Sequence, residues 1–327
     1  MKAIFPYLFI LSLLCISCRQ PVNDGWTDTM NGGLIRIACD ENFKSLMDAE
    51  IEAFEIRYDS AFIIPVYTNE TEAIRLMLDD SVRFALTTRD INPQEKRAFE
   101  GKKCGVRKSL VAFDGVALIT NLANKDSIIG LPALKKILTG EITNWTQINP
   151  ASNMDTIRVL FEGNQSGVLR YALDSIVRGD NLSPYLYALN NSAEVVRKVA
   201  EMPDAIGLIG FLNVEEDKVR LMRVSKEEHA TLTNSYLPYE GDIVHENYPL
   251  WRPVYVLLSD PRSGLSTAFS IFVVNEIGQK VIQKSGLLTV NGSHIMDVAI
   301  RDEFPQINNN NKNKLIKTTE NEDKNEN

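Results

Sequence analysis

Leu34-Ile35-Arg36-Ile37-Ala38 is an apolar run typical of a short β-strand, and similar runs follow at 61–66 and 84–86. Between them, apolar residues recur at helical spacing in 43–56 and again in 72–78. This order of strand, helix, strand, helix, strand predicts a parallel sheet with right-handed crossovers. Ligands of such sheets bind beyond the carboxyl ends of the strands, so we expect binding residues in the loops that follow these three strands.

The rest of the body alternates strands and helices in the same way. We predict strands at 111–120, 157–161, 205–211 and 254–258, and helices at 131–138, 166–177, 193–200 and 266–285. A body of this length suits two compact lobes better than one core. We therefore expect an α/β protein with two lobes.

The two ends of the chain differ from this body. Residues 1–17 begin with a lysine, continue as an apolar run and end at a serine directly before Cys18. This pattern resembles a bacterial lipoprotein signal peptide, in which Cys18 carries the lipid and residues 18–33 form a tether. A cleaved secretory signal with an incidental cysteine is the alternative. Either interpretation places the protein outside the cytoplasm, and the polar residues 306–327 are expected to be a disordered tail.

Composition argues against several classes of function. A formal net charge of −8 disfavours a nucleic-acid partner, which would need a basic face. The sequence shows no Cys and His spacing typical of a metal site, and we expect no cofactor. Cys39 and Cys104, which follow the signal segment, could form a disulfide in an oxidising compartment.

Five motifs follow one another along the body. They are FDGVALITN at 113–121, LTGEITNW at 138–145, NQSG at 164–167, AIGLIGF at 205–211 and YPLWRPVYV at 248–256. Together they resemble the periplasmic phosphate-binding proteins of phosphate ABC transporters, the PstS-like group. The resemblance implies a type II periplasmic-binding-protein fold, with parallel-dominated sheets, a hinge near Asn121 and Tyr248, and ligand held in the cleft between the lobes. With this hinge, lobe 1 would hold residues 34–120 and 249–305, and lobe 2 would hold residues 121–248. It also implies a monomer without catalysis that delivers phosphate to a membrane permease.

The resemblance carries over to candidate ligand residues position by position. Ser166 and Gly167, at the start of a predicted helix, match the family's anion cradle, although Val168 replaces its third, hydroxyl-bearing residue. The first two loops depart from the pattern, because they hold carboxylates where the family has small and hydroxyl residues. The candidate ligand residues are Asp40, Glu41, Asn69, Glu70, Arg83, Thr87, Thr88, Glu162, Asn164, Ser166 and Gly167.

Two charges are exchanged relative to the family. Glu162 stands where the family has an arginine, and Arg83 stands where it has an aspartate. One interpretation is that the pair meets across the cleft, with Arg83 supplying positive charge to an anion. The other is that one or both point to solvent and the ligand differs. Like charges 4 Å apart repel by about 4 kcal/mol at an effective dielectric near 20, so a different oxyanion, a zwitterion or no ligand remain alternatives.

Other residues are expected to have structural roles. Trp145 is predicted to be a packing anchor, Trp251-Arg252 to pack at the hinge, and Asp114-Gly115 to form a turn or bulge. The leading hypothesis is a solute-binding protein for a small anion, phosphate by resemblance. A sensor or accessory relative with an altered or lost anion site is the alternative, whereas an enzyme such as a phosphatase has no supporting pattern of residues.

Overall fold

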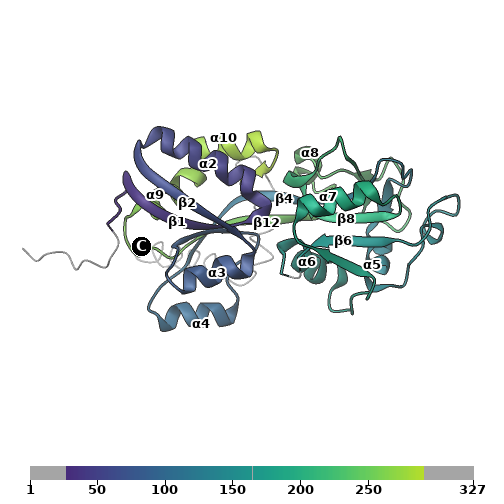
Figure 1. Cartoon of the computed structure of the whole chain (residues 1–327), viewed down its shortest axis with the longest axis horizontal. Coiled ribbons are helices and arrows are strands. Elements are labelled where there is room, and N and C mark those ends of the chain that lie inside the picture. The colour runs from purple at the N-terminus through teal and green to yellow at the C-terminus, as the bar shows by residue number, and fades with distance from the viewer. Residues whose placement is uncertain (1–26, 164, 291–327) are drawn as a thin grey trace, which may run out of the picture.

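The computed structural model describes residues 27–163 and 165–290, which form two lobes side by side (Figure 1). Two long strands, β4 (Arg107–Asn121) and β12 (Trp251–Leu258), lie between the lobes. Cys18, Asn164 and the predicted tail lie outside the described residues. In the described part of the chain, no helix is long and apolar enough to cross a membrane.

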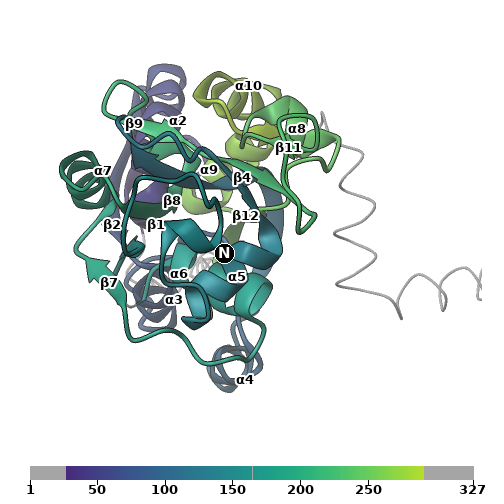
Figure 2. The same ribbon diagram turned by 90° about the vertical axis from the view of Figure 1, so that its right-hand side faces the viewer.

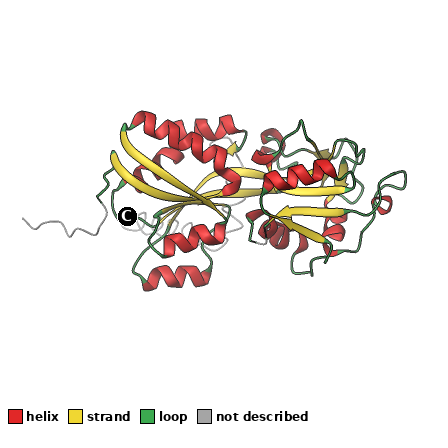
Figure 3. Cartoon of the chain, in the orientation of Figure 1, coloured by secondary structure: helices red, strands yellow, loops and turns green. Residues whose placement is uncertain are grey.

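Lobe 1 is a sheet with helices on both faces (Figure 3). Its strand order is β2 (Ser60–Thr68), β1 (Gly32–Asp40), β3 (Phe84–Thr87), β12 and β4, with the short β13 (Leu288–Thr289) also paired to β4. The first three strands are parallel, and β12 runs antiparallel to both of its neighbours. One face packs on α2 (Lys44–Arg57), α9 (Leu265–Val274) and α10 (Glu276–Ser285), and the other on α3 (Glu70–Leu78) and α4 (Pro93–Gly101).

Lobe 2 repeats this layering around the far half of β4. The sheet continues through β8 (Ala205–Gly210), β6 (Arg158–Glu162) and β7 (Leu186–Leu189), with β9 (Val219–Leu221) also paired to β4. Helix α7 (Ser192–Glu201) covers one face, and α5 (Leu131–Thr139) and α6 (Gly167–Tyr171) cover the other (Figure 2). A small second sheet and a short helix complete the lobe, formed by β5 (Ile128–Gly130), β10 (Arg223–Ser225), β11 (Ser235–Tyr236) and α8 (Glu240–Val244).

Strand β4 changes partners where it passes from one lobe to the other. Residues up to Gly115 pair with β12, and residues from Val116 onward pair with β8. This change lies five residues before the predicted boundary at 120/121, so the strand pairing favours an earlier crossing point. The predicted boundaries themselves stay a prediction.

Three predictions about local structure are wrong. Asp114 and Gly115 continue β4 instead of forming a turn, and the bulge lies three residues earlier, at Val111, opposite the Val254/Tyr255 step of β12. The helix predicted at 266–285 is two helices separated at Asn275. The predicted tether ends early, because Asp28 contacts Leu265 N at 2.5 Å and Arg262 Nη2 at 3.1 Å and so packs on lobe 1.

The structure also decides the predictions about Trp145, the two cysteines and the direction of the strands. Trp145 is fully buried in the core of lobe 2 and donates its indole N–H to Asp204 O at 2.9 Å, as expected of a packing anchor. Cys39 and Cys104 are both free cysteines, so the structure does not form the disulfide that a location outside the cytoplasm would allow. The sheets are also less parallel than predicted, since the strands joining the lobes are antiparallel.

Candidate ligand site between the lobes

Hydrogen bonds and ion pairs join the two lobes where the strands β1, β3 and β6 end. On one side, Asn213 Nδ2 of lobe 2 lies 3.1 Å from Asn42 O of lobe 1. On the other, Arg170 Nε of lobe 2 lies 3.0 Å from Glu70 Oε2 of lobe 1. The lobes are therefore closed on each other. We refer to the following residues as the interlobe site: Asp40, Asn42, Glu70, Thr88, Asp114, Glu162, Gly167, Arg170, Ser192 and Arg252.

Arg252 is the central cation of the interlobe site. It is the second residue of β12, is 1% exposed, and places Nε and Nη2 2.9 Å from Asp114 Oδ2 on the neighbouring strand. Nη2 is not aligned for a hydrogen bond, and Nη1 has no hydrogen-bond partner among the described residues. The guanidinium group lies 5.7 Å from the centroid of the Phe43 ring. A buried guanidinium with spare N–H groups is a strong donor for an oxyanion.

Two glycines allow the lobe 2 backbone to approach this guanidinium. A Cβ atom on Gly167 would lie 3.0 Å from Arg252 Nη1, and one on Gly210 would lie 3.2 Å from Nη2. Both distances are tighter than an ordinary van der Waals contact, so a larger residue at either position would require Arg252 or the lobe 2 backbone to shift by a few tenths of an ångström. Gly167 follows Ser166, whose hydroxyl accepts from Leu169 N at 3.1 Å and caps α6.

Glu70 is the best-bonded carboxylate of the site. It is 2% exposed at the first position of α3, and its Oε1 accepts hydrogen bonds from the Thr88 hydroxyl and, at 2.6 Å, from Thr88 N. Although burial raises the pKa of Glu70, the Arg170 charge, the Thr88 hydroxyl and the Arg252 charge together hold it below its usual value. Glu70 is therefore ionised at neutral pH.

Asp40 and Glu162 are less well satisfied. Asp40 Oδ1 accepts from Asn42 N at 3.0 Å and Asn42 Nδ2 at 2.9 Å, whereas Oδ2 has no hydrogen-bond partner among the described residues. Burial and the nearby charge of Glu70 raise the pKa of Asp40 to about 7. Glu162 Oε2 lies 3.0 Å from the Ser192 hydroxyl, Oε1 has no partner in the described part of the chain, and burial raises the pKa of this group as well.

The predicted pairing of Arg83 with Glu162 is wrong. Arg83 lies before the amino end of β3, where its Nε is 2.9 Å from Asp80 Oδ1 and its Nη1 is 3.3 Å from Asp260 Oδ1. The interlobe site lies at the other end of this strand, and four residues of strand span roughly 13 Å. Arg83 is thus part of an ion-pair cluster at the far end of lobe 1. Arg252 and Arg170 supply the positive charge that the sequence interpretation assigned to it.

The other predicted ligand residues divide into two groups. The structure brings Asp40, Glu70, Thr88, Glu162 and Gly167 together in the interlobe site, with the capping Ser166 beside them. It gives other partners to Thr87, whose hydroxyl donates to Arg89 O at 2.8 Å, and to Asn69, whose side chain accepts from Glu72 N at 2.9 Å and caps α3. Glu41 is exposed to solvent. Asn164 lies outside the described residues.

Sequence reasoning missed the pair at the centre of the site. Asp114 stands alone in an otherwise apolar run and was interpreted as a turn, and Arg252 was assigned to hinge packing. The signal for Asp114 was present, because a carboxylate inside a buried strand requires a charged partner. Its partner is 138 residues away in the sequence, so only the antiparallel pairing of β4 with β12 reveals it. Arg170 and Ser192 gave no comparable signal.

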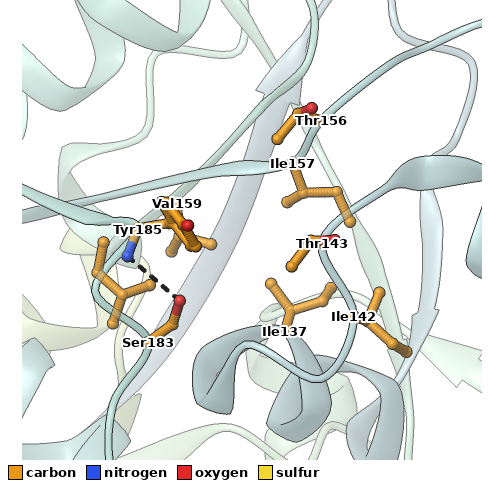
Figure 4. A pocket seen from close by; sticks show the side chains of 9 residues that line it. Ile137, Ile142, Thr143, Thr156, Ile157, Val159, Ser183 and Tyr185 are labelled. Atoms are coloured by element: carbon orange, nitrogen blue, oxygen red, sulfur yellow. Dashed lines mark hydrogen bonds between the residues drawn. The ribbon is translucent and has the colours of Figure 1, made fainter.

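A cavity of about 370 Å³ lies in lobe 2 near the amino end of β6 (Figure 4). Its lining includes Ile137, Ile157 and Val159, and its polar groups include Ser183, whose hydroxyl accepts from Tyr185 N at 3.2 Å. No charged side chain lines this cavity. It is therefore a poor candidate for an anion site, in contrast to the interlobe site at the carboxyl end of the same strand.

Comparison with known proteins agrees with this architecture. Residues 26–276 match the model of a PBP superfamily domain, which is most of the chain. The chain belongs to the PBP superfamily. This confirms the predicted resemblance and the predicted two-lobed fold.

Similar members of the superfamily come from several bacteria. The Borreliella burgdorferi phosphate-binding protein PstS is 21% identical over 297 residues, covering 89% of this chain and 99% of that protein. The Bacillus subtilis phosphate-binding protein PstS is 25% identical over 196 residues, covering 59% of this chain and 60% of that protein. A Clostridium perfringens crystal structure with bound phosphate has a TM-score of 0.68 at 24% identity, covering 79% of this chain and all of that one. At this identity the solved structure supports the superfamily fold alone.

Proposed function

We propose that this chain captures inorganic phosphate at the interlobe site and presents it, without chemical change, to an ABC transporter. The observation that carries the proposal is Arg252, a buried guanidinium whose Nη1 has no hydrogen-bond acceptor among the described residues. A buried donor of this kind is costly unless a ligand satisfies it. The names of the PstS relatives support phosphate as that ligand.

The mixture of donors and acceptors favours phosphate over sulfate. Beside the Arg252 donors, Asp40 Oδ2 and Glu162 Oε1 are buried acceptors without donors in the described ranges. Near neutral pH, phosphate still carries a proton that it can donate to a carboxylate, whereas sulfate carries none. A site that bonds a ligand hydroxyl rejects an analogue lacking it, because a buried polar group is then left unpaired.

Titration calorimetry of the purified chain with phosphate and sulfate tests this proposal. We expect phosphate to bind with one site per chain and sulfate to bind at least about 100-fold more weakly, in keeping with discrimination by a lost hydrogen bond. Arg252→Gln should abolish the phosphate heat while the circular dichroism spectrum remains that of the folded protein. No heat from phosphate up to millimolar concentration, with the wild-type chain shown to be folded, would contradict the proposal.

One observation favours a second function. Glu70 holds donors that an anion would use, so the chain could be a sensor or accessory relative whose anion site is altered or lost. The two functions differ in their response to ligand. A transport protein saturates with phosphate and docks on a permease, whereas a relative without the site stays closed and gives no heat with any small anion.

We also propose that the protein acts outside the cytoplasm, facing the periplasm, and is anchored to a bacterial membrane through a lipid on Cys18. The support is the sequence pattern that ends in a serine before this cysteine. Cys18→Ala should release the protein from the membrane fraction or block its processing. An unchanged mass and unchanged membrane fractionation of the variant would contradict the anchor. Whether the chain acts as a monomer can be measured on the same material by light scattering.

A further inference from the structure

The Glu70 carboxylate accepts hydrogen bonds from N–H and hydroxyl groups of the kind that bind an oxyanion. Its carboxylate receives the backbone N–H and hydroxyl of Thr88 and faces Arg170 Nε at 3.0 Å. It also reaches the lobe 2 backbone, since a Cβ atom on Gly167 would lie 2.9 Å from Glu70 Cδ. Arg252 Nη1 is 3.0 Å from that same Cβ position. A carboxylate therefore lies between Thr88, Gly167 and the two arginines.

We propose that Glu70 is an intramolecular anion that holds the lobes together without ligand and that phosphate must displace it to bind. The identity of the displacing ligand rests on the function proposed above. The closure itself does not, because it follows from contacts between Glu70 on lobe 1 and Arg170 on lobe 2. Glu70 thus sets the affinity of the interlobe site by competing for its donors.

Glu70 and phosphate exclude each other for two reasons. Thr88 has one backbone N–H and one hydroxyl proton, and both are directed at Glu70 Oε1. A phosphate in the same place would also lie beside the Glu70 carboxylate, and two such charges repel strongly inside a protein. Only one of the two anions can occupy these donors at a time.

Other parts of the network are arranged for such an exchange. The Arg170 Nη2 group lies 3.0 Å from the Thr88 hydroxyl and 3.2 Å from Thr88 O, so a second cation lies beside the Thr88 donors that phosphate would take over from Glu70. Glu70 is at the first turn of α3, next to the capping residue Asn69, and a side-chain rotation moves its carboxylate without unfolding the helix. The binding-competent population is then the fraction with Glu70 rotated away, which lowers the apparent phosphate affinity by that fraction.

The experiment compares wild type with Glu70→Ala, Glu70→Gln and the control Glu72→Gln. Glu72 lies on the same helix and pairs with Arg75 at the surface, so the control removes the same charge outside the interlobe site. Glu70→Gln keeps the side-chain size and guards against a folding defect in Glu70→Ala. Small-angle X-ray scattering of phosphate-free protein reports closure, and calorimetry with inorganic phosphate reports affinity.

We expect phosphate-free Glu70→Ala to have a larger radius of gyration than wild type, to close again with phosphate, and to bind phosphate about 10-fold or more tightly than wild type. Glu70→Gln should lie between the two, and Glu72→Gln should match wild type in both readouts. A phosphate-free Glu70→Ala as compact as wild type would overturn the proposal, as would equal phosphate affinity of the two proteins. If Glu70→Ala opens but neither protein binds phosphate, the closure by Glu70 stands and the proposed function fails.

Discussion

The two ends of the lobe 1 sheet each bury an arginine, and the two arginines differ in how they are satisfied. At the outer end, Arg83 is held by Asp80 and Asp260. At the interlobe end, Arg252 is paired with Asp114, but its Nη1 has no hydrogen-bond partner among the described residues. A buried charge whose partners are local is a structural element, whereas one with spare donors between two lobes is suited to a ligand. Burial and charge alone do not distinguish them.

The largest expected effect is the difference between substituting Arg252 and substituting Arg83. Arg252→Gln should weaken phosphate binding by about 100-fold or more, because losing one member of a buried charge pair costs about 2–5 kcal/mol. Arg83→Gln should lower the free energy of unfolding by about 2 kcal/mol, since Asp260 loses one of its two arginine partners, and leave the phosphate affinity unchanged. Calorimetry and urea denaturation of both variants measure the two effects. A loss of binding in Arg83→Gln would remove the distinction between the two ends of the sheet.

Glu50 extends the comparison to a carboxyl group outside the interlobe site. It is fully buried in α2, neither oxygen has a hydrogen-bond partner among the described residues, and burial raises its pKa from 4.5 to about 9. Between these values the folded protein retains a proton that the unfolded chain has lost, so stability must fall as the pH rises. The expected contribution is about 1.4 kcal/mol per pH unit, or roughly 2–3 kcal/mol between pH 6 and pH 8.

Urea denaturation at the two pH values checks this contribution. Glu50→Gln should remove most of the pH dependence, and Glu52→Gln, an exposed position on the same helix, should leave it intact. The account of Glu50 is wrong if wild type and Glu50→Gln lose stability equally between pH 6 and pH 8.

Within the interlobe site, Asp40 is expected to contribute to the preference for phosphate over sulfate. Its pKa is raised by burial and by Glu70 to about 7, so at pH 8 it is ionised and can accept a proton from bound phosphate. Asp40→Asn should therefore reduce the phosphate-to-sulfate affinity ratio at pH 8 by about tenfold, the effect of one hydrogen bond to a charged group. In wild type the ratio should also fall as the pH drops through 7, because the protonated carboxyl no longer accepts. A ratio that is the same in both proteins would show that Asp40 does not contact the ligand.

The smallest effect on phosphate affinity is expected for Glu41, the neighbour of Asp40 in the sequence. Glu41 is the residue directly after Asp40, but its side chain is exposed. Glu41→Gln should change the phosphate affinity by no more than about twofold, since exposed charges interact weakly through water. Parallel titrations of Asp40→Asn and Glu41→Gln test whether only one of two adjacent carboxylates belongs to the site.

Sequence patterns predicted the fold well and the site in part, for physical reasons. The apolar runs at β1 and β2 and the stripe of α2 are local signals, and they predicted elements with nearly correct bounds. The rule that ligands bind beyond strand ends predicted Asp40, Glu70 and Thr88, and the structure brings these three residues together between the lobes. Their contact with a ligand stays a prediction. It could not show that Glu70 turns toward Thr88 and Arg170, because side-chain direction and lobe closure are not local. For the same reason, the sequence pattern points to Arg83 and not to Arg252.

The most direct test of the central claim is a crystal structure of the protein saturated with phosphate. We expect a phosphate oxygen within hydrogen-bond distance of Thr88 N and Arg252 Nη1, with the Glu70 carboxylate turned away from Thr88. Glu70 still bonded to Thr88, with phosphate bound elsewhere or not at all, would contradict the claim that ligand and Glu70 compete for one set of donors.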